Sequence, residues 1–160
     1  MHEAREFLGA LYGRKPKGTK IVLWTKSDKR SHYFDDVAGA GKVARESKLD
    51  VYVHVSLADR DLGASARVKA AQSAGIPGLW ADIDVNGGPE KKTNAAPTAE
   101  AALELAYSLL EPTLVVNSGY GLQAWWLFED PWIFESSDER KAGAQMADAW
   151  IRMLRVGALE

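Results

Sequence analysis

Short apolar runs that fit β-strands alternate along this chain with stretches that carry a helical stripe of apolar residues. Strand patterns are predicted at residues 21–24, 32–34, 51–57, 78–84, 114–116 and 122–128. Helical patterns are predicted at residues 3–12, 35–47, 66–73 and 98–111, and from a capping box at 136–139 onward. The alternation therefore predicts a fold that mixes helices with strands.

The composition narrows the classes of protein to consider. The 160 residues suffice for one domain that buries its core without a metal or a disulfide. Cysteine is absent, which excludes a disulfide scaffold, a thiolate zinc site and a cysteine nucleophile. No apolar stretch approaches the roughly 18 residues of a membrane span, and no leader opens the chain, so we expect a cytoplasmic protein without a membrane partner.

The net charge of −2 hides an asymmetry between the two halves of the chain. Residues 1–80 carry 14 Lys and Arg against 9 Asp and Glu, whereas residues 81–160 carry 6 against 13. Such a distribution is typical of an enzyme that acts on a phosphate backbone through metal ions. A chance distribution over a solvated surface would give the same counts, so the charge alone leaves both interpretations open.

Two carboxylates, Asp82 and Asp84, close the apolar strand pattern of residues 78–84. Side chains at positions i and i+2 of a strand point to the same face, with their Cα atoms roughly 7 Å apart. A divalent cation would offset the repulsion between the two carboxylates, and paired metal ions serve phosphoryl transfer. The alternative is an edge strand that carries both carboxylates into solvent before a turn.

A glycine-containing segment, Asn117 to Gln123, joins the last two predicted strands. Its Gly119 and Gly121 permit a close approach of the backbone to a ligand, and its N–H groups suit an anion such as a triphosphate. Gln123 can donate a side-chain hydrogen bond to the same ligand. The alternative is an ordinary hairpin loop.

Two groups of basic residues complete the set of candidates. Lys91 and Lys92 follow the turn after the acidic pair and would neutralise phosphate charge. A basic loop near the N-terminus is a candidate contact for a DNA template, with Arg14, Lys15, Lys17 and Lys20. In both cases the alternative is a solvated loop.

Taken in order, these segments resemble the archaeo-eukaryotic primase superfamily, in the primase-polymerase branch found in phages, plasmids and other mobile elements. The resemblance rests on residues 78–84, Lys91-Lys92 and residues 114–127, with a helix between. It implies an α+β fold: an RRM-like antiparallel catalytic sheet over residues 76–160, with helices on one face, and an N-terminal α/β portion over residues 1–75. It also implies metal-dependent nucleotidyl transfer from nucleoside triphosphates.

Carried over by position, Asp82 and Asp84 match the acidic pair with which the family binds Mg²⁺ or Mn²⁺. Ser118 and Gly119 match the start of its nucleotide-binding motif, which continues here through Tyr120 and Gly121. That motif usually ends in histidine, whereas this chain has Gln123. Glutamine can still donate to a phosphate but carries no positive charge, so triphosphate binding is expected to be weaker.

A second departure concerns a third carboxylate, which the family carries on a later strand. After Phe128 no acidic residue lies in a convincing strand pattern, Asp130 and Asp148 included. Residues 1–160 are then either a catalytic domain truncated at its C-terminal end, which we favour, or a degenerate member of the family. As it stands, the domain should bind metal and nucleotide weakly but extend no primer. The expected partners are the DNA template and primer, nucleoside triphosphates and a fused or separate helicase.

Two other functions stay open. The first is a non-catalytic replication initiator, which would bind DNA through the same sheet with a vestigial acidic pair. A chelator of metal ions would leave the DNA binding of such an initiator unchanged. The second is a nuclease that uses the acidic pair, which would degrade labelled DNA instead of incorporating nucleotide.

Overall fold

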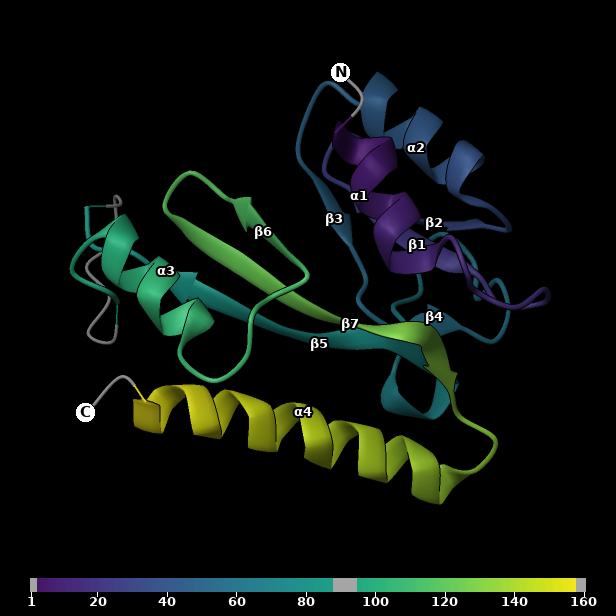
Figure 1. Ribbon diagram of the computed structural model, residues 1–160. Coiled ribbons are helices and arrows are strands. Elements are labelled where there is room, and N and C mark those ends of the chain that lie inside the picture. Colours follow the sequence, from purple (N-terminus) through teal and green to yellow (C-terminus); the bar gives the residue numbers. More distant parts are fainter. Residues whose placement is uncertain (1–2, 88–94, 158–160) are drawn as a thin grey trace. The chain divides into compact units, whose positions relative to one another are not determined.

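The computed structural model describes residues 3–87 and 95–157, and helices and antiparallel strands both occur in it (Figure 1). The prediction of an α+β fold is therefore confirmed. The chain divides into two compact units. Unit 1 comprises Met1–Pro77 and Phe128–Ala142, and unit 2 comprises Gly78–Leu127 and Gly143–Glu160. Residues 128–142 therefore belong with the N-terminal segment and not with residues 78–127.

Unit 1 begins with helix α1 (Glu3–Tyr12), whose bounds match the predicted helix. The helix ends where the amide of Gly13 donates to the carbonyl oxygen of Gly9 at 2.8 Å. Tyr12 is buried and donates its hydroxyl to the carbonyl oxygen of His54 at 2.8 Å. Burial raises the pKa of Tyr12 far above its usual value, so this side chain stays a neutral donor in the core.

Strand β1 (Ile21–Thr25) is the centre of a three-stranded antiparallel sheet in unit 1. Strands β2 (Arg30–Phe34) and β3 (Val51–Val53) pair with its two edges. Helix α2 (Val37–Glu46) follows β2 and starts where Asp36 accepts a hydrogen bond from the amide of Gly39. The uninterrupted apolar run of β1 suits its central position, because every residue of the strand except Trp24 is buried.

The strand predicted over residues 51–57 is wrong as a single element. It stops at Val53, and the chain re-enters a sheet as β4 (Leu57–Ala58), in which Leu57 pairs with Gly75 of β5. The alternation of apolar residues reports which positions are buried, not which strand they pair with. The strand ends here because its pairing partner changes.

The helix predicted over residues 66–73 is also wrong. Only a short 3₁₀ turn, η1 (Ala70–Gln72), forms there. The preceding segment lies across the sheet, with Val68 packed against Val22 and with the Tyr33 hydroxyl donating to the carbonyl oxygen of Ala66 at 3.2 Å. These long-range contacts favour a non-helical backbone over the local helical preference of the alanines.

Strands β5 (Ser73–Asp84) and β7 (Gly121–Ile133) are longer than predicted and run through both units. Each contains a proline, Pro77 in β5 and Pro131 in β7. The fixed φ angle of proline is compatible with an extended strand, which loses only one hydrogen-bond donor there. In these two strands proline therefore removes one hydrogen-bond donor but does not end the strand.

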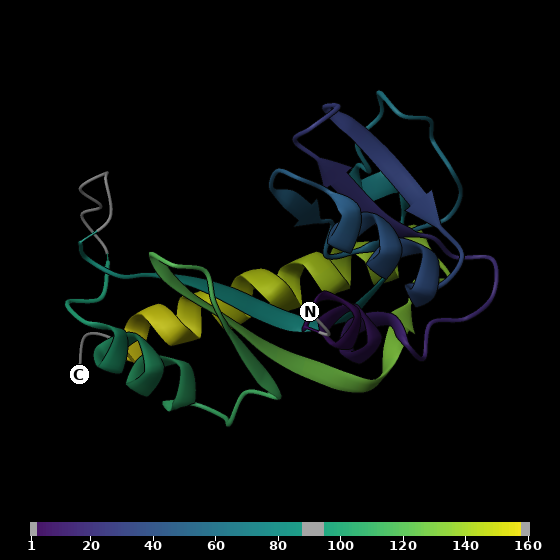
Figure 2. The same cartoon turned by 90° about the horizontal axis from the view of Figure 1, so that it is seen from above.

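Unit 2 contains the strand order β5-β7-β6, in which β6 (Leu114–Asn117) pairs antiparallel with β7. Helix α4 (Ser137–Gly157) runs along β5 and β7 (Figures 1 and 2). The indole rings of Trp126 and Trp150 meet edge to face, with their centroids 4.8 Å apart. Trp126 also donates its Nε1 hydrogen to the carbonyl oxygen of Leu110 at 2.8 Å.

Helix α3 (Ala99–Tyr107) begins as predicted, with Thr98 accepting a hydrogen bond from the amide of Ala101. It ends earlier than expected. Leu109 and Leu110, predicted on its apolar face, lie beyond the helix and are 41% and 58% exposed. The early end coincides with a side-chain hydrogen bond from Ser108 to the carbonyl oxygen of Leu105, an alternative to the helical ladder that serine often takes.

None of the described helices is long and apolar enough to cross a membrane.

The turn between β1 and β2 depends on one carboxylate, Asp28. The hydroxyl of Thr25 donates to Asp28, as does the amide of Arg30 at 3.1 Å, and His32 Nε2 lies 3.0 Å from it. The hydrogen bond from Thr25, followed by the smaller contributions of Arg30 and His32, holds the pKa of Asp28 below its usual value of 3.8. The stabilisation from this depressed pKa is present above about pH 4 and is lost as the pH falls through the lowered value.

We therefore expect Asp28→Asn to remove part of the acid sensitivity of the fold. Urea unfolding between pH 2 and pH 6 checks this, with the parent losing more stability than the variant as the pH falls. Asp35 and Asp50 contribute the same acid sensitivity in both proteins. Hydrogen bonds from Lys20 to Asp35 and from Lys26 to Asp50 lower the pKa values of these two carboxyl groups independently of Asp28. Identical slopes for the parent and the variant would contradict this role of Asp28.

Candidate functional site

The acidic pair lies at the end of β5, in unit 2. Ile83 between the two carboxylates is 8% exposed and points into the core, whereas Asp82 is exposed and Asp84 is half-buried. Because side chains alternate along a strand, both carboxylates share the face opposite Ile83. The structure thus keeps the arrangement that the sequence predicted for this pair.

The face that carries the acidic pair can be followed across the sheet through two tryptophans. Trp80 of β5 and Trp125 of β7 stack with their ring centroids 6.3 Å apart, which places them on the same face. By alternation, Asp82 and Asp84 share the face of Trp80, and Gln123 shares that of Trp125. Trp126, whose side chain contacts α4, points to the opposite face. Gln123 and the two carboxylates are therefore on the side of the sheet away from α4.

The loop between β6 and β7 is a compact turn. Asn117 accepts a hydrogen bond from the amide of Gly119 at 2.8 Å, and the amide of Ser118 donates to the carbonyl oxygen of Gly121 at 2.9 Å. Gly119 has a φ angle of 94°, which glycine adopts without strain. Since two of the loop amides serve the turn itself, the hydroxyl of Ser118 and the side-chain amide of Gln123 are the clearer donors toward a ligand.

The structure brings this loop and the acidic pair together. The amide of Val85 donates to the carbonyl oxygen of Tyr120 at 3.0 Å. A β-carbon at Gly121 would lie 2.6 Å from the carbonyl oxygen of Ile83 and 3.2 Å from the Cα atom of Asp84. Only glycine allows two backbones to approach this closely. Two motifs more than 30 residues apart in the sequence therefore form one continuous surface.

The segment after the acidic pair is fixed at both of its described ends. The amide of Ala96 donates to the carbonyl oxygen of Asp84 at 2.7 Å, and the amide of Asn86 donates to the carbonyl oxygen of Ala96 at 2.8 Å. The predicted phosphate-neutralising pair, Lys91 and Lys92, falls outside the described residues. Helix α3 begins three residues after Ala96, at Ala99.

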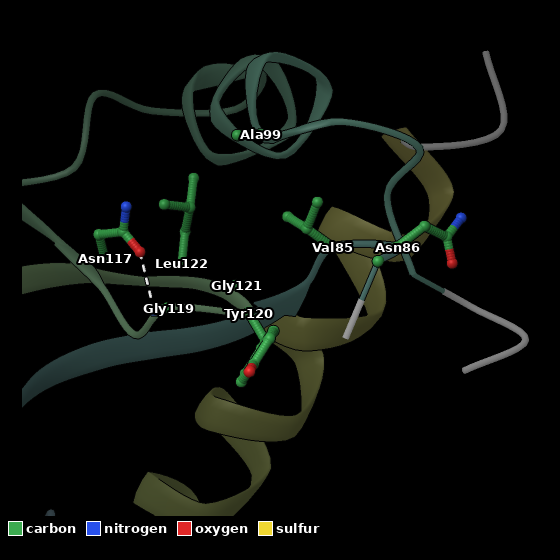
Figure 3. Close-up of a pocket in the computed structure, with 9 residues that line it drawn as sticks. Val85, Asn86, Ala99, Asn117, Gly119, Tyr120, Gly121 and Leu122 are labelled. Carbon is green, nitrogen blue, oxygen red and sulfur yellow. Dashed lines mark hydrogen bonds between the residues drawn. The ribbon is translucent and has the colours of Figure 1, made fainter. Parts of the chain in front are cut away.

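A pocket of about 240 Å³ adjoins the loop (Figure 3). Figure 3 shows Val85 and Leu122 pointing toward α3, whereas the side chain of Tyr120 points away from that helix. The acidic pair, Ser118 and Gln123 do not line the pocket, which is bordered by Val85, Asn86, Gly87, Ala99, Asn117, Gly119, Tyr120, Gly121 and Leu122. Asn86 and Ala99 were not predicted as site residues. The Asn-x-Gly pattern of the loop could have indicated the structural role of Asn117.

Most of the basic side chains in the loop of unit 1 contact other residues of the chain. Arg14 donates to the carbonyl oxygen of Glu129 at 3.0 Å, and Lys15 donates to that of Thr19 at 2.7 Å. Burial lowers the pKa of Lys15 from its usual value. Lys20 forms an ion pair with Asp35 at 2.6 Å. The role of these residues in contacting DNA stays a prediction, and Lys17 is the member for which the described residues show no such contact.

The carboxylates beyond Phe128 are placed differently from the prediction. Glu129 and Asp130 do lie on a strand, β7, where each carboxylate is 3.9 Å from Arg14. The expectation that none lay in a strand was wrong, because β7 continues through Pro131. Asp148 lies on α4 and pairs with Arg152 at 2.7 Å. Among residues 3–87 and 95–157, no cluster of three or more histidine or acidic side chains suited to a metal ion was found.

The geometry thus defines a candidate site of two carboxylates, a glycine turn and a glutamine, all within unit 2. Comparisons of the chain with protein-family models, with curated proteins and with solved structures gave no match.

Proposed function

We propose that this chain is a nucleotidyltransferase domain of the primase-polymerase type, part of an enzyme that transfers nucleotides to a primer or an initiating nucleotide on a DNA template. The observation that carries the proposal is the close packing of Gly121 against Ile83 and Asp84. It joins a pair of carboxylates to a glycine turn with polar donors. Metal and triphosphate sites must be adjacent in an enzyme that transfers nucleotides.

The residues of the acidic pair fit a hard divalent cation. Carboxylate oxygens are the ligands that Mg²⁺ and Mn²⁺ prefer, and Asp82 and Asp84 offer them from one strand face. Asp82 is exposed and Asp84 is half-buried, so solvent and a nucleotide can reach this face at Asp82. When bound, the metal would supply positive charge for the transferring phosphoryl group. Asp82 and Asp84 would hold it in place.

The triphosphate would be held by the loop and by the strand that follows it. The hydroxyl of Ser118 and the amide of Gln123 would donate to phosphate oxygens, while Gly119, beside which a β-carbon would meet no atom within 4 Å, leaves room for the ligand near the backbone. Tyr120 is 63% exposed and borders the same loop. Lys91 and Lys92 would add positive charge to the phosphates.

The proposed activity defines the partners. The enzyme would act in the cytoplasm on a DNA template and primer, with nucleoside triphosphates as substrates and a fused or separate helicase to expose the template strand. A phage, plasmid or other mobile element is the source that fits an enzyme of this type.

A series of charges at position 123 tests the proposal. Binding of dATP in the presence of Mn²⁺, measured by titration calorimetry, should weaken by about tenfold or more in Gln123→Glu, because a carboxylate repels the triphosphate. Gln123→His should bind more tightly than the parent at pH 6, and this advantage should shrink at pH 8, where the imidazole is neutral.

The matched control is Gln145→His, which places the same side chain on the exposed surface of α4. It should bind dATP as the parent does at both pH values. Equal dATP affinity in the parent, Gln123→Glu and Gln123→His would contradict the nucleotide site. Degradation of labelled DNA by the parent protein with Mn²⁺ would favour a nuclease instead.

A further inference from the structure

Helix α3 and the turn that follows it expose a concentration of large apolar side chains in unit 2. Four of the nine exposed large apolar residues in the described part of the chain lie here, namely Leu103, Tyr107, Leu109 and Leu110. Each of the four is more than 40% exposed. Leu103 and Tyr107 are four residues apart on α3, so they form an apolar stripe along one side of the helix. The two leucines extend this apolar surface into the turn.

The exposure of these side chains follows from how the segment is anchored. Ala102 and Ala106 are fully buried, and they mark a different side of α3 from the apolar stripe. In the turn, the carbonyl oxygen of Leu110 accepts the Nε1 hydrogen of the buried Trp126 at 2.8 Å. The apolar side chains are therefore carried by a backbone that is held in place from within unit 2.

Three carboxylates border the apolar side chains. Glu100 and Glu104 each stand three residues before a member of the apolar stripe, a spacing that makes two side chains neighbours on a helix. Glu111 directly follows the two leucines of the turn. Within the described part of the chain, none of these glutamates takes part in an ion pair. Residues 95–128 contain no lysine or arginine, so the surface is both apolar and acidic.

We propose that this surface, the α3 surface (Leu103, Tyr107, Leu109 and Leu110 with the three glutamates), binds a basic amphipathic helix of a partner protein. The apolar face of such a helix would cover the stripe and the turn, and its lysines or arginines would pair with the carboxylates. A second copy of the same surface would bring carboxylates against carboxylates, and nucleic acid or an anionic membrane would be repelled. The inference goes beyond the proposed nucleotidyl transfer and needs no metal ion, nucleotide or DNA.

The experiment is fluorescence anisotropy with a labelled synthetic peptide of about 18 residues, in which leucines form one face of a helix and lysines flank that face. The buffer contains EDTA and no nucleotide, so failure of this inference leaves the proposed transfer reaction intact, and the reverse also holds. A peptide of the same composition, reordered so that leucines and lysines no longer form separate faces, should bind at least about tenfold more weakly. A peptide with glutamate in place of lysine should not bind.

Substitutions locate the contact on the protein. Leu110→Ser should weaken binding of the basic amphipathic peptide by about tenfold, because an apolar contact is lost. The fold should persist, since the hydrogen bond from Trp126 uses the carbonyl oxygen of this residue and not its side chain. Glu104→Lys should also weaken binding by about tenfold and should reduce its dependence on salt, because an attraction becomes a repulsion.

The matched controls carry the same substitutions elsewhere on the surface. Met153→Ser replaces a side chain that is 51% exposed on α4, and Glu6→Lys reverses an exposed charge on α1. Both should bind the basic amphipathic peptide as the parent does. Circular dichroism should show the helix content of the parent in all four variants.

Three results would overturn the inference. The first is a parent protein that does not bind the basic amphipathic peptide. The second is equal affinity of the parent for this peptide and for the reordered one, which would reduce the contact to general charge attraction. The third is an equal decrease of affinity in Leu110→Ser and Met153→Ser. A parent that binds no peptide but forms a dimer, which Leu110→Ser converts into a monomer, would make the α3 surface a contact between two copies of the chain instead.

Discussion

Replacing Gly121 by alanine is expected to destabilise the protein by about 3 kcal/mol and to abolish nucleotide binding. The added β-carbon would lie 2.6 Å from the carbonyl oxygen of Ile83, a distance that forces one of the two backbones to move. Because both neighbours are main-chain atoms, no side chain can rotate to relieve the overlap. The glycine turn between β6 and β7 and the end of β5, which carries the acidic pair, would therefore separate.

Urea unfolding measures the change in stability, and two other glycines serve as controls. A β-carbon at Gly9, inside α1, meets no atom within 4 Å, so Gly9→Ala should stabilise the helix by about 1 kcal/mol. Gly119 also has open space, but its φ angle of 94° makes Gly119→Ala cost about 1 kcal/mol through backbone strain. A Gly121→Ala protein as stable as the parent would contradict the packing of the loop against Asp84.

Replacing Asp84 by asparagine is expected to weaken Mn²⁺ binding by at least about tenfold, because the number of ligand charges sets the affinity of an oxygen site for a divalent cation. Asp82→Asn should have the same effect from the other member of the pair. Neither change should unfold the protein, because Asp82 is exposed and Asp84 is only half-buried. Titration calorimetry and circular dichroism measure the two quantities separately.

The matched control for the metal is Asp148→Asn, which removes a carboxylate that pairs with Arg152 on the surface of α4. It should bind Mn²⁺ as the parent does. If Asp148→Asn and Asp84→Asn weaken Mn²⁺ binding by the same factor, the cation is held by general surface charge and not by the acidic pair.

Much of the fold follows from local patterns in the sequence. The helix over residues 3–12 has a clear apolar stripe and a glycine after it, and the structure reproduces both ends. The strand that ends in the acidic pair and the two strands on either side of the glycine turn were also predicted at their places. In these segments the burial pattern and the local preference agree.

The errors occur where long-range contacts decide the structure. Residues 51–57 alternate as one strand should, yet the chain changes sheets after Val53. Near Val68, packing against Val22 is accompanied by a non-helical backbone despite the helix-forming alanines. The strand predicted over residues 122–128 stops short of Pro131, through which β7 continues. The local pattern of a single sequence does not indicate which distant strand each segment pairs with.

The candidate site shows the same division. The residue types and the spacing of Asp82 and Asp84 predicted a shared strand face, since alternation is a local property. The contact of Gly121 with Asp84 was not predicted, because it depends on how β5 and β7 pair. The participation of Asn86 and Ala99 in the neighbouring pocket likewise follows from the pairing of Ala96 with the end of β5.

The most direct test of the central claim is the linkage between metal and nucleotide in unit 2. The affinity of the parent protein for dATP is measured by titration calorimetry with Mn²⁺ and again with EDTA, alongside the double variant Asp82→Asn with Asp84→Asn. If the carboxylates and the glycine turn form one site, the parent binds dATP at least about tenfold more tightly with Mn²⁺ than with EDTA, and the double variant shows no such difference. Equal affinity of the parent with Mn²⁺ and with EDTA, or a metal effect that persists in the double variant, would contradict the claim.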